Sequence, residues 1–165
     1  MSEIDPTAVG AGSNGECVMK TLIIIWSTLL SVSAAFGNDF HLYVSDAGNF
    51  SNPPWQILKY DQEGGNPEIF INSNLAWPQD IVFLESTGTV LISNLNNGTI
   101  TRHDAETGAF IDNFATGIGG PTRMKIGADK MLYVLQWSGN GRVRRYQLDG
   151  TFVDEFTGVG VTQSI

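Results

Sequence analysis

Three five-residue segments of this chain resemble one another and are evenly spaced. They begin at Ile57, Ile100 and Val143, so each starts 43 residues after the one before it. They read Ile-Leu-Lys-Tyr-Asp, Ile-Thr-Arg-His-Asp and Val-Arg-Arg-Tyr-Gln, with an apolar residue first, a basic residue third and an aromatic or histidine residue fourth. A repeat of this kind restricts the chain to folds that stack copies of one small unit.

Each unit of the repeat contains four short segments rich in apolar and β-branched residues, separated by turn signals. In the best-defined unit we expect strands at 122–126, 132–135, 143–146 and 152–156. An Asn-Gly pair at 97–98 marks a hairpin of the preceding unit, because both residues tolerate a positive φ. Short strands with a period in the forties are typical of β-propeller blades. We therefore predict an all-β chain of four-stranded antiparallel blades, forming an incomplete ring.

The repeat region holds about three blades and is out of phase at both ends. We place the units at 42–76, 77–119 and 120–158; the first lacks its innermost strand, and the last is followed by the start of another unit. Propellers close with about four to eight blades, and an open array exposes strand edges. The sequence therefore favours a fragment, or a protomer that completes its ring by self-association. A third alternative, a non-functional product of gene truncation, would aggregate or be proteolysed.

An apolar run precedes the repeat region. Residues 19–37 have the features of a secretory signal peptide, with Lys20 as the basic start, an apolar run at 22–32 and small residues after it. The run is too short for an ordinary membrane span, and a buried strand is the alternative. Residues 1–18 are acidic, so we interpret them as a non-native extension. The prediction is a secreted or periplasmic protein, 38–165, without a stable membrane span after cleavage.

The charge of the chain limits its partners. The formal net charge is −8, and removing residues 1–37, which hold Lys20 and three acidic residues, leaves about −6. A nucleic-acid surface needs a basic patch, so we expect no nucleic-acid partner. The single cysteine, Cys17, precedes the expected mature chain, which excludes a disulfide or a cysteine-based site there.

The repeat resembles a known class of propellers. Gly-Pro at 120–121, Leu-Tyr-Val at 132–134, and Val-Arg-Arg-Tyr followed by Asp-Gly-Thr-Phe at 143–152 are similar to NHL repeats. They also resemble the wider six-bladed group that includes gluconolactonase-like hydrolases and the virginiamycin B lyase type. The resemblance covers about 40–165 and implies the fold. Because such propellers include enzymes, binders of sugars or proteins, and receptors, it leaves the activity open.

Residues that recur in every blade are expected to build the blades. Lys59, Arg102 and Arg145 share one column, and we interpret them as surface or inter-blade pairing groups, with Asp61 and Asp104 as candidate partners.

The next column holds Tyr60, His103 and Tyr146. We therefore expect His103 to pack as a ring rather than to act in catalysis. A lyase of the virginiamycin type would need a His and a Glu facing the axis, and the only other His of the mature chain is His41.

Residues that differ between blades are candidates for a single ligand-binding site. The second strand of each unit ends in Asp46, Asn94 or Gln136. The family resemblance implies that this end of the strand approaches the axial opening of the propeller.

Gln79, Asp80 and Arg123 belong to the same region, because they lie at the start of the innermost strands. In gluconolactonase-like enzymes a divalent cation lies on the axis, so the resemblance implies Asp46, Asp80 and Asn94 as counterparts for Ca²⁺ or Mg²⁺. No matched Glu accompanies them, and we expect no other cofactor.

The loop at 47–55 is about five residues longer than its counterparts and contains Trp55. Insertions in repeat proteins fall on loops of one face, often the binding face. Trp55 and Trp137 are therefore candidates for stacking on a sugar or anchoring a partner, although packing on the blade is equally compatible with the pattern. The chain contains no catalytic signature. We predict a module that binds a protein, peptide or glycan; the alternative is a fragment of a metal-dependent lactone hydrolase-like or lyase-like enzyme.

Overall fold

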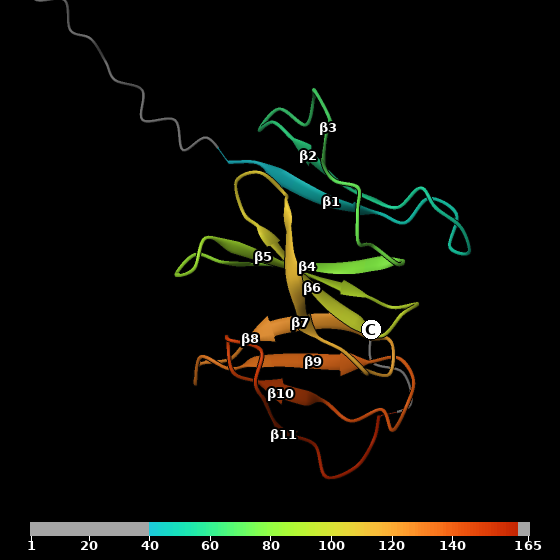
Figure 1. Ribbon diagram of the computed structural model, residues 1–165, viewed down its shortest axis with the longest axis vertical. Helices are drawn as coiled ribbons and strands as arrows, with labels where there is room; N and C mark the ends of the chain where they lie inside the picture. The colour runs from blue at the N-terminus through green and yellow to red at the C-terminus, as the bar shows by residue number, and fades with distance from the viewer. Residues whose placement is uncertain (1–39, 162–165) are drawn as a thin grey trace, which may run out of the picture. The chain divides into compact units, whose positions relative to one another are not determined.

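The computed structural model describes residues 40–161, which fold into three antiparallel sheets (Figure 1). The predicted signal peptide at 19–37 and the extension at 1–18 lie outside the described residues. Over 40–161 the chain forms strands and turns. In this range no helix is present that is long and apolar enough to cross a membrane.

Each sheet corresponds to one unit of the sequence repeat, and we call the sheets blades 1, 2 and 3. Blade 1 contains β1 (Leu42–Asp46), β2 (Gln56–Tyr60) and β3 (Glu68–Ile71). Blade 2 contains β4 (Pro78–Leu84), β5 (Thr89–Asn94), β6 (Thr99–Asp104) and β7 (Phe110–Ala115). Blade 3 contains β8 (Pro121–Ile126), β9 (Leu132–Gln136), β10 (Arg144–Tyr146) and β11 (Phe152–Glu155). The predicted all-β architecture of partial propeller blades is confirmed.

The strands of the three blades pair in the same register. Directly opposite residues are Leu42 and Tyr60 in blade 1, Val90 and His103 in blade 2, and Leu132 and Tyr146 in blade 3. The first and third of these pairs are chemically identical. Because side chains alternate between the two faces of a strand, a shared register places equivalent side chains on equivalent faces.

We call the face of a blade that is directed toward the preceding blade its leading face, and the opposite face its trailing face. Apolar residues of these faces form the contacts between the blades. Between blades 1 and 2 the buried residues are Ile57, Ile71, Val90 and Ile92. Between blades 2 and 3 they include Leu91, Ile100 and Phe114 from the trailing face of blade 2, and Leu132, Val134 and Tyr146 from the leading face of blade 3. The core is therefore a series of blade–blade interfaces.

A turn glycine fixes how closely consecutive blades approach. Gly108 connects β6 to β7 with φ of 72°, and a Cβ at this position would collide with the carbonyl oxygen of Phe70 in blade 1. Gly150 connects β10 to β11 with φ of 104°, and its Cβ would lie 2.6 Å from the carbonyl oxygen of Phe114 in blade 2. Glycine satisfies both requirements, since it adopts positive φ and has no Cβ.

The basic column pairs across the two outer strands of its own blade. Lys59 lies opposite Glu68, with Nζ and Oε1 3.0 Å apart. Arg102 is paired with Asp112 at 3.1 Å and Arg145 with Asp154 at 2.6 Å, again between directly opposite residues.

The expectation that Asp61 and Asp104 would be the partners is wrong, because each carboxylate caps its own turn. Asp61 accepts hydrogen bonds from Gly65 N at 2.7 Å and Asn66 Nδ2 at 2.8 Å. Asp104 accepts them from Glu106 N at 3.1 Å and Thr107 N at 2.8 Å. These bonds lower the pKa of both carboxyl groups.

Candidate functional site

Asn94 and Gln136 end the second strand of blades 2 and 3, and both side chains are buried. Asn94 Oδ1 accepts a hydrogen bond from Ala76 N at 2.8 Å, and Gln136 Oε1 accepts one from Gly119 N at 2.9 Å. Ala76 and Gly119 are themselves 43 residues apart. The two amides therefore have one structural role, which is to hold the connection that leads into an innermost strand. Their predicted ligand-binding role stays a prediction.

Asp46 is the counterpart in blade 1 and is partly buried. Its Oδ1 accepts from Gly48 N at 2.9 Å, and its Oδ2 accepts from Gln56 Nε2 at 3.1 Å. The carboxylate thus fixes the beginning and the end of the long loop at 47–55.

Asp80, in β4, links the innermost strands of two blades. Its Oδ2 accepts from Met124 N at 2.6 Å, and its Oδ1 accepts from Ile81 N at 3.0 Å. Arg123 is exposed, and its Nη1 lies 3.5 Å from the carbonyl oxygen of Gln79. The structure therefore brings Gln79, Asp80 and Arg123 together at the junction of β4 and β8. Their predicted ligand-binding role stays a prediction.

The side chains predicted to hold a cation already make hydrogen bonds within the fold, and their role as metal ligands stays a prediction. Both carboxylate oxygens of Asp80 accept backbone hydrogen bonds, and both of Asp46 are engaged in the loop. Asn94 is fully buried and donates through Nδ2 to Ile92 O and Thr101 Oγ1, each at 3.2 Å. Over residues 40–161 no group of three or more His, Cys, Asp or Glu side chains is arranged to hold a metal ion.

His103 is fully buried and packs edge-on against Phe110, with ring centroids 5.6 Å apart. Tyr146 packs in the same way against Phe152 at 5.6 Å. His103 Nδ1 lies 3.1 Å from Gly108 O, which can only accept, so Nδ1 carries the proton, and Nε2 accepts from Thr101 Oγ1 at 3.0 Å. Burial lowers the pKa of His103 and keeps the imidazole neutral. These contacts give His103 a packing role.

The long loop forms one wall of a shallow pocket of about 450 Å³. Its apolar lining consists of Pro53, Pro54, Trp55, Ile69 and Leu75, and its polar lining of Gln56, Asn72 and Asn74. The indole Nε1 of Trp55 is buried and has no hydrogen-bond acceptor among the described residues. An apolar hollow with a few convergent amides is the usual composition of a binding site.

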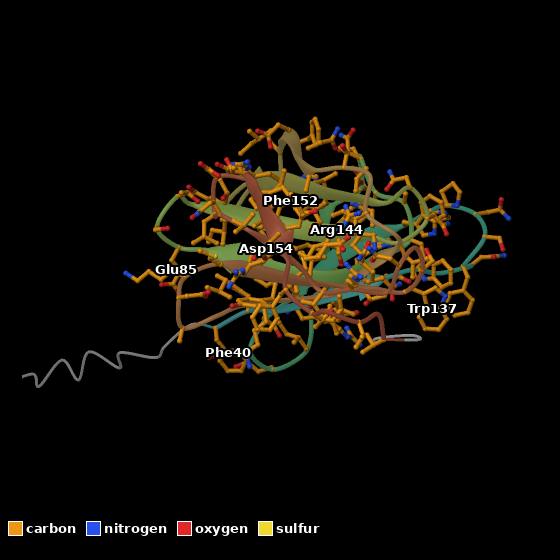
Figure 2. The ribbon with its side chains drawn as sticks, turned by 90° about the horizontal axis from the view of Figure 1, so that it is seen from below. Phe40, Glu85, Trp137, Arg144, Phe152 and Asp154 are labelled. Carbon is orange, nitrogen blue, oxygen red and sulfur yellow. The ribbon has the colours of Figure 1, made fainter. Side chains whose placement is uncertain are left out.

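Trp77 and Trp137 do not line this pocket. Trp77 packs against Phe50, with ring centroids 5.1 Å apart, and has a positive φ of 55°. Gly120, its equivalent in the next blade, has a φ of 60°. Trp137 is 39 % exposed and lies at one edge of the domain, away from Arg144 and Phe152 (Figure 2).

Arg144 is a candidate binding residue that the sequence pattern did not single out. It lines a cavity of about 560 Å³ between the outer strands of blades 2 and 3, together with Phe114, Tyr146 and Phe152. Its Nη1 donates to Gly117 O at 2.8 Å, and its guanidinium lies 6.0 Å from the centre of the Phe152 ring. The sequence does contain a signal for this residue. The equivalent positions in the other blades hold Leu58 and Thr101, so an arginine occurs at this position of the repeat only in blade 3.

Comparisons with known proteins identify the fold. No model of a protein family matches the chain, and no curated protein sequence matches it. Among solved structures, a chain of the crystal structure of the Nidogen/Laminin Complex superimposes with a TM-score of 0.58 at 18 % identity, covering 75 % of this chain and 49 % of that chain. An X-ray structure of a putative gluconolactonase superimposes with a TM-score of 0.53 at 18 % identity, covering 68 % of this chain and 37 % of that one.

The chain thus spans half or less of the length of these two structures. The likeness confirms the resemblance to the NHL-like and gluconolactonase-like propellers at the level of the fold. At this identity it carries no statement about activity.

Proposed function

We propose that this propeller segment is a binding module that holds an extended stretch of another protein in the pocket beside Trp55. The observation that carries the proposal is the composition of that pocket, in which an aromatic and apolar floor is combined with three amide side chains. Aromatic residues in apolar pockets are the usual anchors of protein recognition, while amides can bind a peptide backbone.

The position of the pocket supports a polypeptide ligand. Ile69 lies in β3, which is the outermost strand of blade 1, and this residue is exposed. An edge strand offers unpaired N–H and C=O groups to an extended chain, and the neighbouring pocket can accept one of its side chains. One structural neighbour is a chain of the Nidogen/Laminin Complex, which is an assembly of proteins.

The test is a screen of the full-length chain against an immobilised peptide library and a glycan array. We expect peptide binding that falls at least roughly tenfold in Trp55→Ala, since a buried aromatic anchor contributes about 2 kcal/mol or more. Trp55→Phe, which keeps a ring but removes the N–H, should lose less. Trp137→Ala is the matched control and should bind normally. Binding only to glycans, or peptide binding unaffected by Trp55→Ala, would overturn the proposal.

The lactone hydrolase-like alternative takes its support from the fold that the chain shares with a putative gluconolactonase. It requires a divalent cation near Asp80, and ligation would raise the melting temperature with calcium or magnesium concentration. A metal-dependent rise that disappears in Asp80→Ala would favour this alternative over the binding module.

We also propose that the chain is exported. The proposal rests on the signal-peptide pattern at 19–37. The exported protein should begin near Phe36 or Asn38, whereas a mature peptide beginning at Ser2 would contradict export by this route.

A further inference from the structure

We propose that two copies of this chain associate head to tail, with the trailing face of blade 3 of each copy covered by the leading face of blade 1 of the other. The proposal rests on the blade–blade interface that the chain already forms twice, and it is independent of the Trp55 pocket.

The leading face of blade 1 has the composition of one that is buried elsewhere in the chain. Leu132, Val134 and Tyr146 form the leading face of blade 3 and are buried against blade 2. In the same register, β1 and β2 place Leu42, Val44 and Tyr60 on the equivalent face of blade 1. Leu42 is 53 % exposed, and Val44 and Tyr60 are half-buried, so over the described residues this face is less covered than its counterpart in blade 3.

The trailing face of blade 3 is the complementary surface. Because β9 turns Leu132 and Val134 toward blade 2, Tyr133 and Leu135 lie on its other face. Together with Val143 and Phe156 they line an almost entirely apolar hollow of about 460 Å³. The equivalents in blade 2, Leu91, Ile100 and Phe114, are buried under blade 3. Phe156 is 55 % exposed.

The turn glycines give a second, independent sign that blade 1 can accept a preceding blade. Gly64 N donates to Asp61 O at 3.0 Å, as Gly150 N does to Gln147 O, and the turn of blade 2 is one residue longer, with Gly108 N donating to Asp104 O. Gly108 and Gly150 approach a carbonyl oxygen of the preceding blade, whereas a Cβ on Gly64 would meet nothing within 4 Å among residues 40–161. The turn of blade 1 therefore leaves room for a preceding blade over the described residues.

Charge favours the same pairing. Arg102 Nη2 donates at 3.0 Å to the carbonyl oxygen of Asp149, the residue before the turn glycine of the next blade. Arg145, which pairs with Asp154 and Asp129 within blade 3, is the equivalent of Arg102. Glu63 precedes Gly64 in the turn that Arg145 would face. Glu63 is exposed, so the guanidinium of one copy would meet an acidic turn of the other.

Copies that associate head to tail form a closed ring only if their total number of blades is one that a propeller can have. The described residues of two copies form six sheets, which is within the range of four to eight blades seen in propellers, whereas those of three copies would form nine. On blade 1 the contact falls on β1 and β2, which carry Leu42, Val44 and Tyr60. Two copies are therefore the assembly that the geometry favours.

The test is sedimentation velocity of the full-length chain across a concentration series up to roughly 100 µM. We expect a species with twice the mass of the chain. Gly64→Asn should shift association at least tenfold toward the monomer, because Asn tolerates a positive φ but places a side chain in the contact. Gly88→Asn is the matched control: Gly88 also has positive φ, at 62°, and open space around its Cβ, but it lies in the β4–β5 turn.

Mixing variants distinguishes a head-to-tail contact from other modes. Gly64→Asn blocks the leading face, and Phe156→Asp blocks the trailing face. Each variant alone should be monomeric, whereas an equimolar mixture should regain association, since one intact pair of faces is restored. A wild-type chain that stays monomeric over the whole series, or a mixture that fails to associate while both variants melt normally, would overturn the proposal.

Discussion

Asp80 Oδ2 accepts a hydrogen bond from the backbone N–H of Met124 at 2.6 Å. The bond joins the innermost strand of blade 2 to that of blade 3, and Ser93 strengthens the junction by donating from Oγ to Thr122 O at 2.8 Å. The carboxylate that the family resemblance assigns to a cation therefore holds two blades together.

Replacing Asp80 should weaken the fold whether or not metal is present. Asp80→Ala removes the acceptor of Met124 N and Ile81 N, and a hydrogen bond to a charged group contributes about 1.5–3 kcal/mol. We expect the free energy of unfolding to fall by about that amount, measured by urea denaturation in the presence of a chelator. An unchanged stability would show that the contact carries no energy.

Stability should also fall between pH 7 and pH 5 because of His103. Burial lowers its pKa in the folded state, while the unfolded chain keeps an ordinary value near 6.5. Below that value the unfolded state binds a proton first, so the free energy of unfolding decreases as pH falls, by at most about 1.4 kcal/mol per pH unit.

His103→Tyr isolates this contribution, since tyrosine occupies the same column in blades 1 and 3. Urea denaturation at pH 7, 6 and 5 should give a flatter profile for the variant than for the wild-type chain. Parallel profiles would mean that another group causes the pH dependence.

Two of the cross-strand ion pairs should differ in strength, because one is bidentate and the other is not. Arg145 makes two hydrogen bonds to Asp154, from Nε at 3.0 Å and Nη2 at 2.6 Å, whereas Lys59 contacts Glu68 through Nζ alone. The paired carboxylate raises the pKa of Arg145. Double-mutant cycles should give a larger coupling energy for Arg145–Asp154 than for Lys59–Glu68, and both should weaken in high salt. Equal couplings would show that the bidentate geometry adds nothing.

The fold could be predicted because its signals are repeated in every blade. The strand expected at 122–126 is observed as Pro121–Ile126, and the one at 152–156 as Phe152–Glu155. Alternating apolar residues and turn glycines encode these elements locally, so three copies of a weak pattern reinforce one another.

The candidate site was harder to predict, because two different residue types can have the same structural role in different blades. Asn94 and Gln136 are different residues, and this difference led to the prediction that their column binds a ligand. Both are amides, however, and both hold equivalent backbone N–H groups. Arg144 was not predicted, because it is next to Arg145 in the sequence and was taken as part of the same basic column. Its own column holds Leu58 and Thr101 in the other blades and therefore does vary.

Successive blades pack closely because a turn glycine lies against a carbonyl oxygen of the preceding blade. Comparing Gly108→Ala with Gly88→Ala by thermal and urea denaturation tests this contact. Both positions have positive φ, so the backbone strain of about 1–2 kcal/mol is shared. Only Gly108 lies against Phe70 O. We predict that Gly108→Ala loses about 1–3 kcal/mol more than Gly88→Ala; equal losses would contradict the claim.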